Sequence, residues 1–367
     1  MSPLAGLGDG VAVLHQRLMP NASPGLGDGA WAFVPAALRP TACAVARSSS
    51  YEPALSQLPH VDRGQEGIAM KLARFDGDRL GIVEGDTVVD ITDTVSPRRG
   101  GGRLHSFIEA VAEQGEPATV PAPDAVRHRL SDLTLACPLP APPKVLAAPV
   151  NYLDHKAEMT VEHTVADLGV FLKARTSVIG PGDTVVLPYT DMRFDQEGEL
   201  GIVIGRRVRN LSVEEAMTAV FGYTCLLDMS MRSTEDRSTR KSFDTFTPIG
   251  PWVVTADEIP DPAALGLRCW VGDTLRQETT IADMIFDVPT LVAYASSVMT
   301  LEPGDVIATG TPKGVGPVVD GDRIAVEIEA IGRLEVTVSD RGAIPYGQRV
   351  GAALSPARVT AHAPSHS

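Results

Sequence analysis

The segment FDQEGELGIVIG, residues 194–205, decides how this chain folds. Its second half, LGIVI, is an apolar run that predicts a strand entering a hydrophobic core. Ser212 then opens SVEEAMTAV, and Glu215 three residues later makes a capping box that predicts a helix. The chain returns as GYTCLLDMSMR, residues 222–232, a second apolar strand that ends at Asp228. Strand, helix and strand together predict that Asp228 lies beside the start of the first strand.

Two glutamates stand at that start. Glu197 and Glu199 are two residues apart, so on a strand their side chains share one face. Adjacent carboxylates repel one another unless they are solvated, as on an ordinary surface strand, or bridged by a cation. With Asp228 they form an all-oxygen set, which suits Mg²⁺ or Mn²⁺ better than zinc, since no His or Cys stands at matching spacing. Three ligands leave positions on an octahedral ion for water and for a chelating 2-oxo acid.

Composition excludes several classes of protein. The 367 residues carry a net charge of -14, which argues against nucleic acid as a partner, because phosphates need a basic surface. No apolar run approaches the roughly 18 residues of a membrane span, and no secretory signal is visible, so a cytoplasmic location is expected. The cysteines have no CxxC spacing and predict unpaired thiols in a reducing compartment: Cys43, Cys137, Cys225 and Cys269.

Composition also divides the chain into segments. The first is rich in Gly, Pro, Ala and Ser without periodicity, which predicts a disordered leader or a start-site artefact with the true start near Met70. Short strands split by Asp-Gly and Glu-Gly turns follow, with one helix at Leu104–Ala112. The expected fold class is mainly β with some α (α+β). The expected segments are a leader at 1–69, a small N-terminal domain at 70–140, a catalytic domain at 141–345 and a flexible tail at 346–367.

Further candidate residues lie on both sides of the carboxylates. In NYLDHKAEM, His155 and Glu158 are one helical turn apart, so the carboxylate can orient the imidazole as a general base for water; a polar surface turn is the alternative. Lys241 precedes an apolar, aromatic stretch and is a candidate to stabilise an oxyanion. Two more cations and a hydroxyl are candidates for substrate binding, against the alternatives of solvated side chains and a plain glycine turn: Lys173, Arg232 and Thr311.

Together these segments resemble the fumarylacetoacetate hydrolase family, which includes acylpyruvate hydrolases and 2-hydroxyhepta-2,4-diene-1,7-dioate isomerases. The resemblance covers about residues 144–335. It implies a mixed β-sandwich roll with a small N-terminal domain, commonly as a homodimer. The segments that carry it follow the family's order: NYLDHKAEM, FLKARTSVIGPGD, EGELGIVIG, GYTCLLDMSMR, KSFDTFTPIGPWVV, RQETTIADMIFDV, LEPGDVIATGTPKGVG and GDRIAVEIEAIGRL.

The resemblance also implies roles. The metal ligands are Glu197, Glu199 and Asp228; the dyad on a mobile lid is His155 and Glu158; the oxyanion lysine is Lys241; and the substrate pocket includes Lys173, Arg232 and Thr311. The chain departs from the usual family residues at Pro149 and Arg240 (usually Gly), Leu227 (usually Asn), Ser233 (usually Asp) and Glu235 (usually a substrate-contacting Gln). These departures concern substrate identity more than activity, because the metal ligands and the dyad are retained.

The predicted activity is hydrolytic cleavage of a C–C bond in an acylpyruvate- or fumarylpyruvate-like β-diketo acid. The 2-oxo acid end is expected to chelate a Mg²⁺ or Mn²⁺ ion, which stabilises the charge of the enolate. His155 activates water, and Lys241 stabilises the oxyanion. An isomerase or decarboxylase acting on a related oxo acid is the first alternative, because the same site supports a common enolate. A non-catalytic metal-binding relative is the second, favoured by Glu235 and Leu227 and opposed by the retained dyad.

Overall fold

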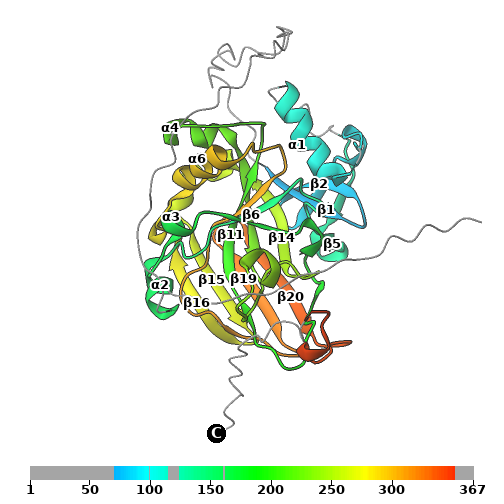
Figure 1. The fold of residues 1–367 in the computed structure, drawn as a ribbon. Helices are drawn as coiled ribbons and strands as arrows, with labels where there is room; N and C mark the ends of the chain where they lie inside the picture. The colour runs from blue at the N-terminus through cyan, green and yellow to red at the C-terminus, as the bar shows by residue number, and fades with distance from the viewer. Residues whose placement is uncertain (1–69, 99, 115–123, 160–161, 352–367) are drawn as a thin grey trace, which may run out of the picture. The chain divides into compact units, whose positions relative to one another are not determined.

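The computed structural model describes residues 70–98, 100–114, 124–159 and 162–351, all within one compact unit. The predicted leader with Cys43 and most of the predicted tail lie outside these residues. Strands dominate the described chain, and the helices between them are short, which confirms the predicted α+β class (Figure 1). None of the described helices combines the length and the hydropathy that crossing a membrane requires.

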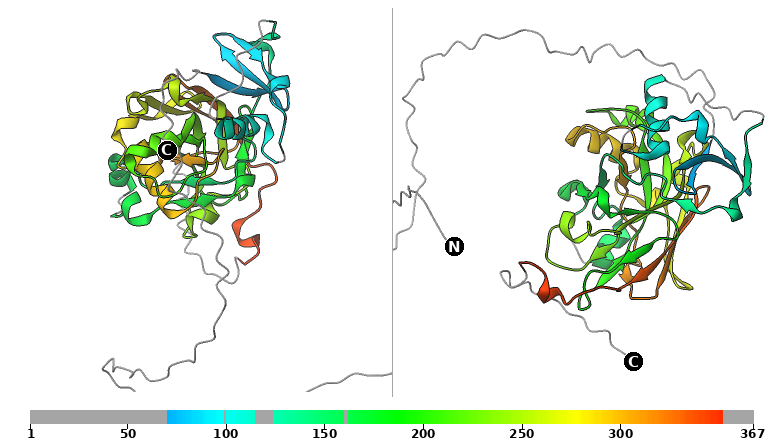
Figure 2. Two further views of the ribbon diagram at one scale, coloured as in Figure 1. Left: turned by 90° about the horizontal axis from the view of Figure 1, so that it is seen from above. Right: turned by 90° about the vertical axis from the view of Figure 1, so that its right-hand side faces the viewer.

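The largest sheet is mixed and has twelve strands, in the order β4-β3-β2-β1-β14-β12-β11-β17-β6-β7, with β5 beside β1 and β8 beside β14. Figure 2 shows the blue N-terminal strands at one end of this sheet. Its strands are β1 (Lys71–Phe75), β2 (Arg79–Glu84), β3 (Thr87–Asp90), β4 (Arg127–Arg129), β5 (Leu135–Ala136), β6 (Val145–Ala147), β7 (Phe171–Lys173), β8 (Val178–Ile179), β11 (Gly198–Ile204), β12 (Val220–Leu227), β14 (Thr247–Thr255) and β17 (Val306–Ala308).

Two smaller sheets complete the fold. A five-stranded sheet has the order β16-β15-β19-β20-β9, and a three-stranded sheet has the order β13-β10-β18. The five-stranded sheet packs against the large sheet, with β15 and β19 on β11 and β12, and β20 on β14. Apolar side chains from both inner faces form the main core, as in a β-sandwich. The strands are β9 (Thr184–Val186), β10 (Phe194–Gln196), β13 (Ser230–Met231), β15 (Gly266–Val271), β16 (Thr274–Thr280), β18 (Gly316–Pro317), β19 (Arg323–Ile328) and β20 (Gly332–Ser339).

The helices pack at the margins of the sheets. Helix α1 buries Leu104, Phe107 and Ile108 beside β1 and β2, which confirms the predicted periodicity (Figure 1). Ser212 caps α4 through the predicted capping box with Glu215, and α4 packs on α6. The six α-helices among the described residues are α1 (Gly102–Gln114), α2 (Leu153–Met159), α3 (Val165–Leu168), α4 (Val213–Ala216), α5 (Arg237–Arg240) and α6 (Val288–Val298).

Residues 70–140 continue the large sheet, since Lys71 and Leu72 of β1 pair with β14 in antiparallel register. The domain boundary near residue 140 therefore stays a prediction. The three cysteines within the described residues are buried and unpaired, as predicted: Cys137, Cys225 and Cys269.

Candidate metal centre and active site

Three buried carboxylates meet where β10, β11 and β12 come together. Glu197 lies between β10 and β11, Glu199 is the second residue of β11, and Asp228 follows β12. Antiparallel pairing sets Gly198 opposite Leu227, and the backbone N–H of Asp228 donates to the carbonyl oxygen of Glu197 at 2.9 Å. The register therefore brings one oxygen of each carboxylate to within 4.8 Å of the others. All three residues are buried, with no more than 4% of their surface exposed.

Two lysines donate hydrogen bonds to this cluster. Lys241 donates from Nζ to Glu197 Oε2 and to Asp228 Oδ2, each at 2.6 Å. Burial by itself lowers the pKa of Lys241, but the charges of Asp228 and Glu197 outweigh it and raise the pKa above its usual value. Lys173 donates to Asp228 and, at 3.0 Å, to the carbonyl oxygen of Phe246. Burial lowers the pKa of Lys173, which Asp228 only partly offsets.

An arginine forms the third support. Arg232 donates from Nε to Asp195 Oδ2 at 2.6 Å and from a terminal nitrogen to Glu197 Oε1 at 2.9 Å. Burial raises the pKa of Glu197, but Lys241 and Arg232 bring it below its usual range, so this carboxylate is ionised. Asp195 also accepts from Arg193. Asp195 was not predicted as part of the site, although it stands in the same FDQEGE segment as the glutamates.

Glu199 is the carboxylate whose interactions a bound cation would complete. Its Oε2 accepts the backbone N–H of Gly310 at 2.8 Å, and its other oxygen has no hydrogen-bond donor within the described chain. Burial and the nearby charge of Asp228 hold the pKa of Glu199 well above its usual value. A divalent cation removes both penalties, because it replaces lost hydration and separates like charges. The donor set, three carboxylates without nitrogen or sulfur, fits Mg²⁺ or Mn²⁺.

The predicted dyad lies on α2. His155 is buried, and its Nδ1 is 3.4 Å from Glu158 Oε2, the one-turn spacing that the sequence predicts. Glu158 also accepts the backbone N–H of Gly314 with both oxygens, at 3.0 and 3.1 Å. The glycine-rich turn thus fixes the carboxylate that orients the imidazole.

Two buried amides organise the walls and were not singled out from the sequence. Gln277 accepts the backbone N–H of Gly198 at 2.8 Å and donates to the Thr311 hydroxyl at 2.7 Å. Thr311 in turn donates to the carbonyl oxygen of Gly198 at 2.9 Å. Asn151 donates to the carbonyl oxygens of Phe286 and Thr309 at 3.0 and 2.8 Å. These amides join segments far apart in the sequence, and Gln277 stands among polar residues in TLRQETT, so no local signal marks it.

A cavity of about 90 Å³ opens onto the cluster. Most predicted site residues line it; Lys173 lies behind Asp228 and Glu158 behind His155, both outside the lining. The lining consists of Ala148, Pro149, Val150, His155, Met159, Phe171, Glu197, Glu199, Asp228, Arg232, Arg237, Arg240, Lys241 and Thr311.

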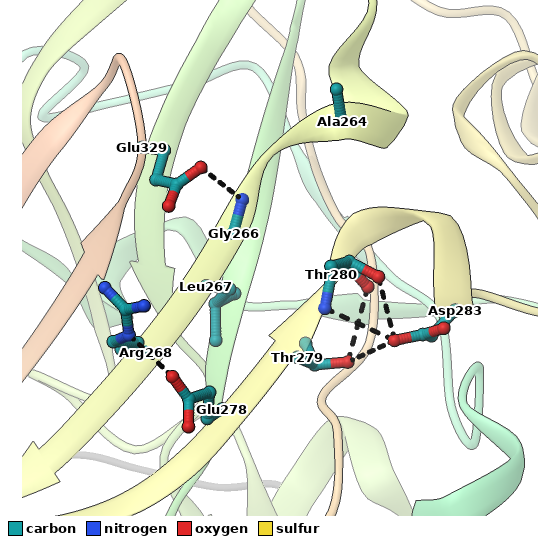
Figure 3. Close-up of a pocket in the computed structure, with 9 residues that line it drawn as sticks. All are labelled: Ala264, Gly266, Leu267, Arg268, Glu278, Thr279, Thr280, Asp283 and Glu329. Carbon is teal, nitrogen blue, oxygen red and sulfur yellow. Dashed lines mark hydrogen bonds and ion pairs between the residues drawn. The ribbon is translucent and has the colours of Figure 1, made fainter.

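A second cavity, about 340 Å³, lies beside β15 and β16 (Figure 3). Its polar groups satisfy one another: Arg268 pairs with Glu278 at 2.8 Å, and Asp283 accepts from the hydroxyls of Thr279 and Thr280. These charged groups are exposed, so they gain little from a ligand. The smaller cavity, with its buried charges, is therefore the candidate site.

Comparison with known proteins agrees with this geometry. Residues 144–339 match the model of the fumarylacetoacetate (FAA) hydrolase C-terminal family, more than half of the chain. The chain belongs to this family. This family member is 40% identical over 287 residues to maleylpyruvate hydrolase of Aquipseudomonas alcaligenes, across 73% of this chain and 99% of that protein. The region that matches the family model, residues 144–339, contains every residue of the cluster and of the dyad.

Solved structures extend the likeness. The crystal structure of maleylpyruvate hydrolase from Sphingobium sp. SYK-6, in complex with manganese (II) ion and pyruvate, is 42% identical, with a TM-score of 0.64. The match covers 75% of this chain and 100% of that one. The bifunctional isomerase/decarboxylase of 4-hydroxyphenylacetate degradation from Salmonella dublin is 43% identical over 206 residues, 55% of this chain and 48% of that protein. This chain is therefore an enzyme of a family that contains hydrolases, isomerases and decarboxylases.

Proposed function

We propose that this enzyme is a metal-dependent hydrolase that cleaves the C–C bond of an acylpyruvate-like β-diketo acid. The observation that carries the proposal is one cavity that is lined both by three buried carboxylates and by a histidine with an acidic partner. Plain metal binding does not require such a general base. The relatives named as maleylpyruvate hydrolases support the hydrolytic choice.

Glu197, Glu199 and Asp228 would hold the cation, which when bound polarises the 2-oxo acid end of the substrate and offsets its negative charge. His155 takes a proton from water through the ring nitrogen that does not face Glu158. The hydroxide adds to the distal carbonyl, and the C–C bond between that carbon and the methylene breaks. The methylene keeps the electron pair and accepts the proton from His155. The products are a carboxylic acid and a 2-oxo acid such as pyruvate.

Lys241 stabilises the negative charge that develops on the attacked oxygen. An ammonium group has three N–H donors, and Glu197 and Asp228 accept from two of them. Lys241 lines the cavity, so the third is available to the substrate. Lys173, fully enclosed behind Asp228, positions that carboxylate.

An isomerase or decarboxylase is the second candidate. The observation that favours it is the likeness to the isomerase/decarboxylase from Salmonella dublin over 206 residues. The dyad serves as a proton shuttle in each of these reactions. Product analysis separates them, since hydrolysis gives two acids, decarboxylation gives CO₂ and isomerisation leaves the mass unchanged.

The test is to add Mn²⁺ or Mg²⁺ to the full chain and to follow the loss of enol absorbance for a panel of acylpyruvates that includes maleylpyruvate. We expect pyruvate release that His155→Ala and Glu199→Ala each lower by about a hundredfold or more. No pyruvate from any panel member, despite tight Mn²⁺ binding, would move the assignment to an isomerase, a decarboxylase or a non-catalytic metal-binding protein.

A homodimer in the cytoplasm completes the proposal, and the dimer rests on the family resemblance. Light scattering coupled to gel filtration measures the mass directly. A mass of one chain at micromolar concentration would refute the dimer.

A further inference from the structure

One glycine-rich turn bonds to both halves of the site. It comprises residues 309–316, TGTPKGVG, which follow β17. In this turn the backbone N–H of Gly310 donates to Glu199 of the carboxylate cluster at 2.8 Å. Further along the same turn, the N–H of Gly314 donates to both oxygens of Glu158, at 3.0 and 3.1 Å. The position of this turn therefore decides how far the dyad lies from the carboxylate cluster.

Gln196 holds the end of the turn that contains Gly314. This glutamine is the last residue of β10 and is fully buried. Its amide nitrogen donates to the carbonyl oxygen of Gly314 at 3.0 Å, and its amide oxygen accepts the N–H of Gly316 at 3.1 Å. In the chain, Gln196 directly precedes Glu197 of the cluster. One side chain therefore joins the cluster to the part of the turn that holds Glu158.

Gln277 holds the middle of the turn in a similar way. Its amide nitrogen donates to the hydroxyl of Thr311 at 2.7 Å and to the carbonyl oxygen of Pro312 at 2.9 Å. Its amide oxygen accepts the N–H of Gly198 at 2.8 Å, and Gly198 stands between the two glutamates of the cluster. Gln277 is 1% exposed, so no water competes for these bonds. It is a second bridge between the cluster and the turn.

The turn also packs closely against its surroundings. Gly310 and Gly314 have φ of 91° and 94°, which glycine adopts without strain. A Cβ atom at Gly314 would lie 1.8 Å from the carbonyl oxygen of Arg276, and one at Gly310 would lie 2.7 Å from the Cβ of Asn151. Asn151 also donates to the carbonyl oxygen of Thr309 at 2.8 Å. Packing and hydrogen bonds together therefore fix the turn in one position.

We propose that Gln196 and Gln277 are positioning residues that act through this turn and fix the dyad relative to the cation bound by the carboxylate cluster. The inference rests on the proposed function for the role of the dyad. Neither glutamine lines the cavity, so neither contacts the substrate. A cation on Glu199 restricts the rotation of the carboxylate that accepts from Gly310, and the turn transmits this restraint to Glu158. Hydrogen bonds that orient metal ligands in this way often matter nearly as much as the ligands themselves.

Hydrogen exchange measures this restraint without turnover. The full chain is exchanged into D₂O with and without saturating Mn²⁺, and mass spectrometry follows the peptides that contain the turn and α2. We expect Mn²⁺ to slow exchange in α2 by about fivefold or more, the lower end of the usual coupling between two sites. Gln196→Met and Gln277→Met, each saturated with Mn²⁺, should lose most of this protection, because methionine fills a similar volume and makes none of the amide bonds.

Two further variants separate positioning from a general loss of stability. Thr255 accepts the N–H of Met70 at 2.9 Å and lies outside the cavity lining, so Thr255→Val also removes a buried bond to the backbone. It should melt at a lower temperature and keep the full protection of α2. Gln277→Glu keeps an oxygen acceptor for Gly198 and loses at least one donor to the turn. It replaces Gln277→Met if that variant does not fold, and should show reduced protection.

A double-mutant cycle with Glu158→Ala gives a second readout. At saturating Mn²⁺, Gln196→Met should lower kcat on an acylpyruvate by about tenfold or more and change KM little. In the Glu158→Ala background the same change should lower kcat much less, because the turn no longer holds a carboxylate beside His155. A glutamine that only supports the fold would lower kcat by the same factor in both backgrounds.

The positioning role is overturned by full Mn²⁺ protection of α2 in both glutamine variants, or by an equal loss of kcat in both backgrounds. It is also overturned if Mn²⁺ binds to the unaltered chain without protecting α2. A chain that binds no Mn²⁺ would refute both this role and the proposed function. If Mn²⁺ binds and no acylpyruvate is cleaved, the hydrolase assignment fails, and the exchange experiment alone decides the positioning role.

Discussion

Glu158 has two hydrogen-bond partners. A substitution can therefore remove its charge and still keep its side chain in place. Glu158 lies 3.4 Å from His155 Nδ1 and accepts the backbone N–H of Gly314. The carboxamide of glutamine also offers an oxygen acceptor, so Glu158→Gln keeps the tie to the glycine-rich turn. It removes only the negative charge beside the imidazole.

We expect Glu158→Gln to lower kcat on an acylpyruvate by about tenfold to a hundredfold and to change KM little, because general-base assistance is weakened while the substrate contacts remain. Steady-state kinetics measures both constants. The exposed Glu162→Gln is the matched control and should leave both unchanged. A large fall in melting temperature, or a KM effect as large as the kcat effect, would mean that Glu158 only holds the turn.

Local spacing made some residues of the site predictable and left others hidden. His155 and Glu158 are one turn apart, and Glu197 and Glu199 are two apart on a strand, so short-range geometry suffices for both pairs. Gln277 instead meets Gly198 across 79 positions. That contact depends on how β16 lies against the large sheet, which no local pattern encodes.

At the scale of elements, the segment after β20 is fastened to the loop that leads into α5. Arg349 pairs with Glu235 at 2.5 Å. Its guanidinium carbon lies within 5.9 Å of the ring centroids of Tyr189, Phe243 and Tyr346. Glu235 stands where the family usually has a substrate-contacting Gln, and an unpaired carboxylate at that place would repel an anionic substrate. Glu235 is instead paired with Arg349 and is not part of the cavity lining.

Arg349→Met should therefore destabilise the fold by about 1 kcal/mol, through lost cation–π contacts and an unpaired, partly exposed Glu235. It should also raise KM for an anionic substrate by a small factor, since the charge of Glu235 is no longer compensated. Urea unfolding and steady-state kinetics give the two values. Arg341→Met, on an exposed turn, is the control. If Arg349→Met and Arg341→Met behave alike, Arg349 does not fasten the segment.

Elements were more predictable than their pairing. Apolar runs and turn residues locate β11, β12 and α1, and the Pro-Gly turns at 180–183 and 302–305 place Gly182 and Gly304 at positive φ, as type II turns require. The sequence does not show that β1 pairs with β14, or that β20 packs on β14, because these contacts join distant parts of the chain.

At the scale of the whole molecule, the carboxylate cluster is a junction. Its residues come from β11, from the end of β12 and from the connection after β10, and the turn containing Gly310 bonds to Glu199. The five-stranded sheet joins in through Gln277 of β16. A cation bound here stabilises all of these elements in the folded state and none of them in the unfolded chain, so its binding energy adds to the stability of the fold.

The metal-free protein should be less stable because it buries these carboxylates without a cation. The pKa of Glu199 is raised on folding. Between the usual value of 4.5 and this raised pKa, the folded state therefore holds a proton that the unfolded chain has lost. That stabilisation is present below the usual value of 4.5 and disappears as pH rises through the folded pKa. At neutral pH without metal, Glu199→Gln should therefore melt at least about 2 °C above the unaltered chain.

Mn²⁺ should reverse that order. At about a hundred times its Kd it adds about 2.7 kcal/mol to the unaltered chain, and much less to Glu199→Gln, which lacks a ligand. The rise in melting temperature should grow from about pH 5 to about pH 8, because the cation competes with the proton on Glu199. Calorimetric melting across that range measures it, with exposed Glu214→Gln as control. An equal Mn²⁺ effect in Glu199→Gln, or one that shrinks as pH rises, would place the cation elsewhere on the molecule.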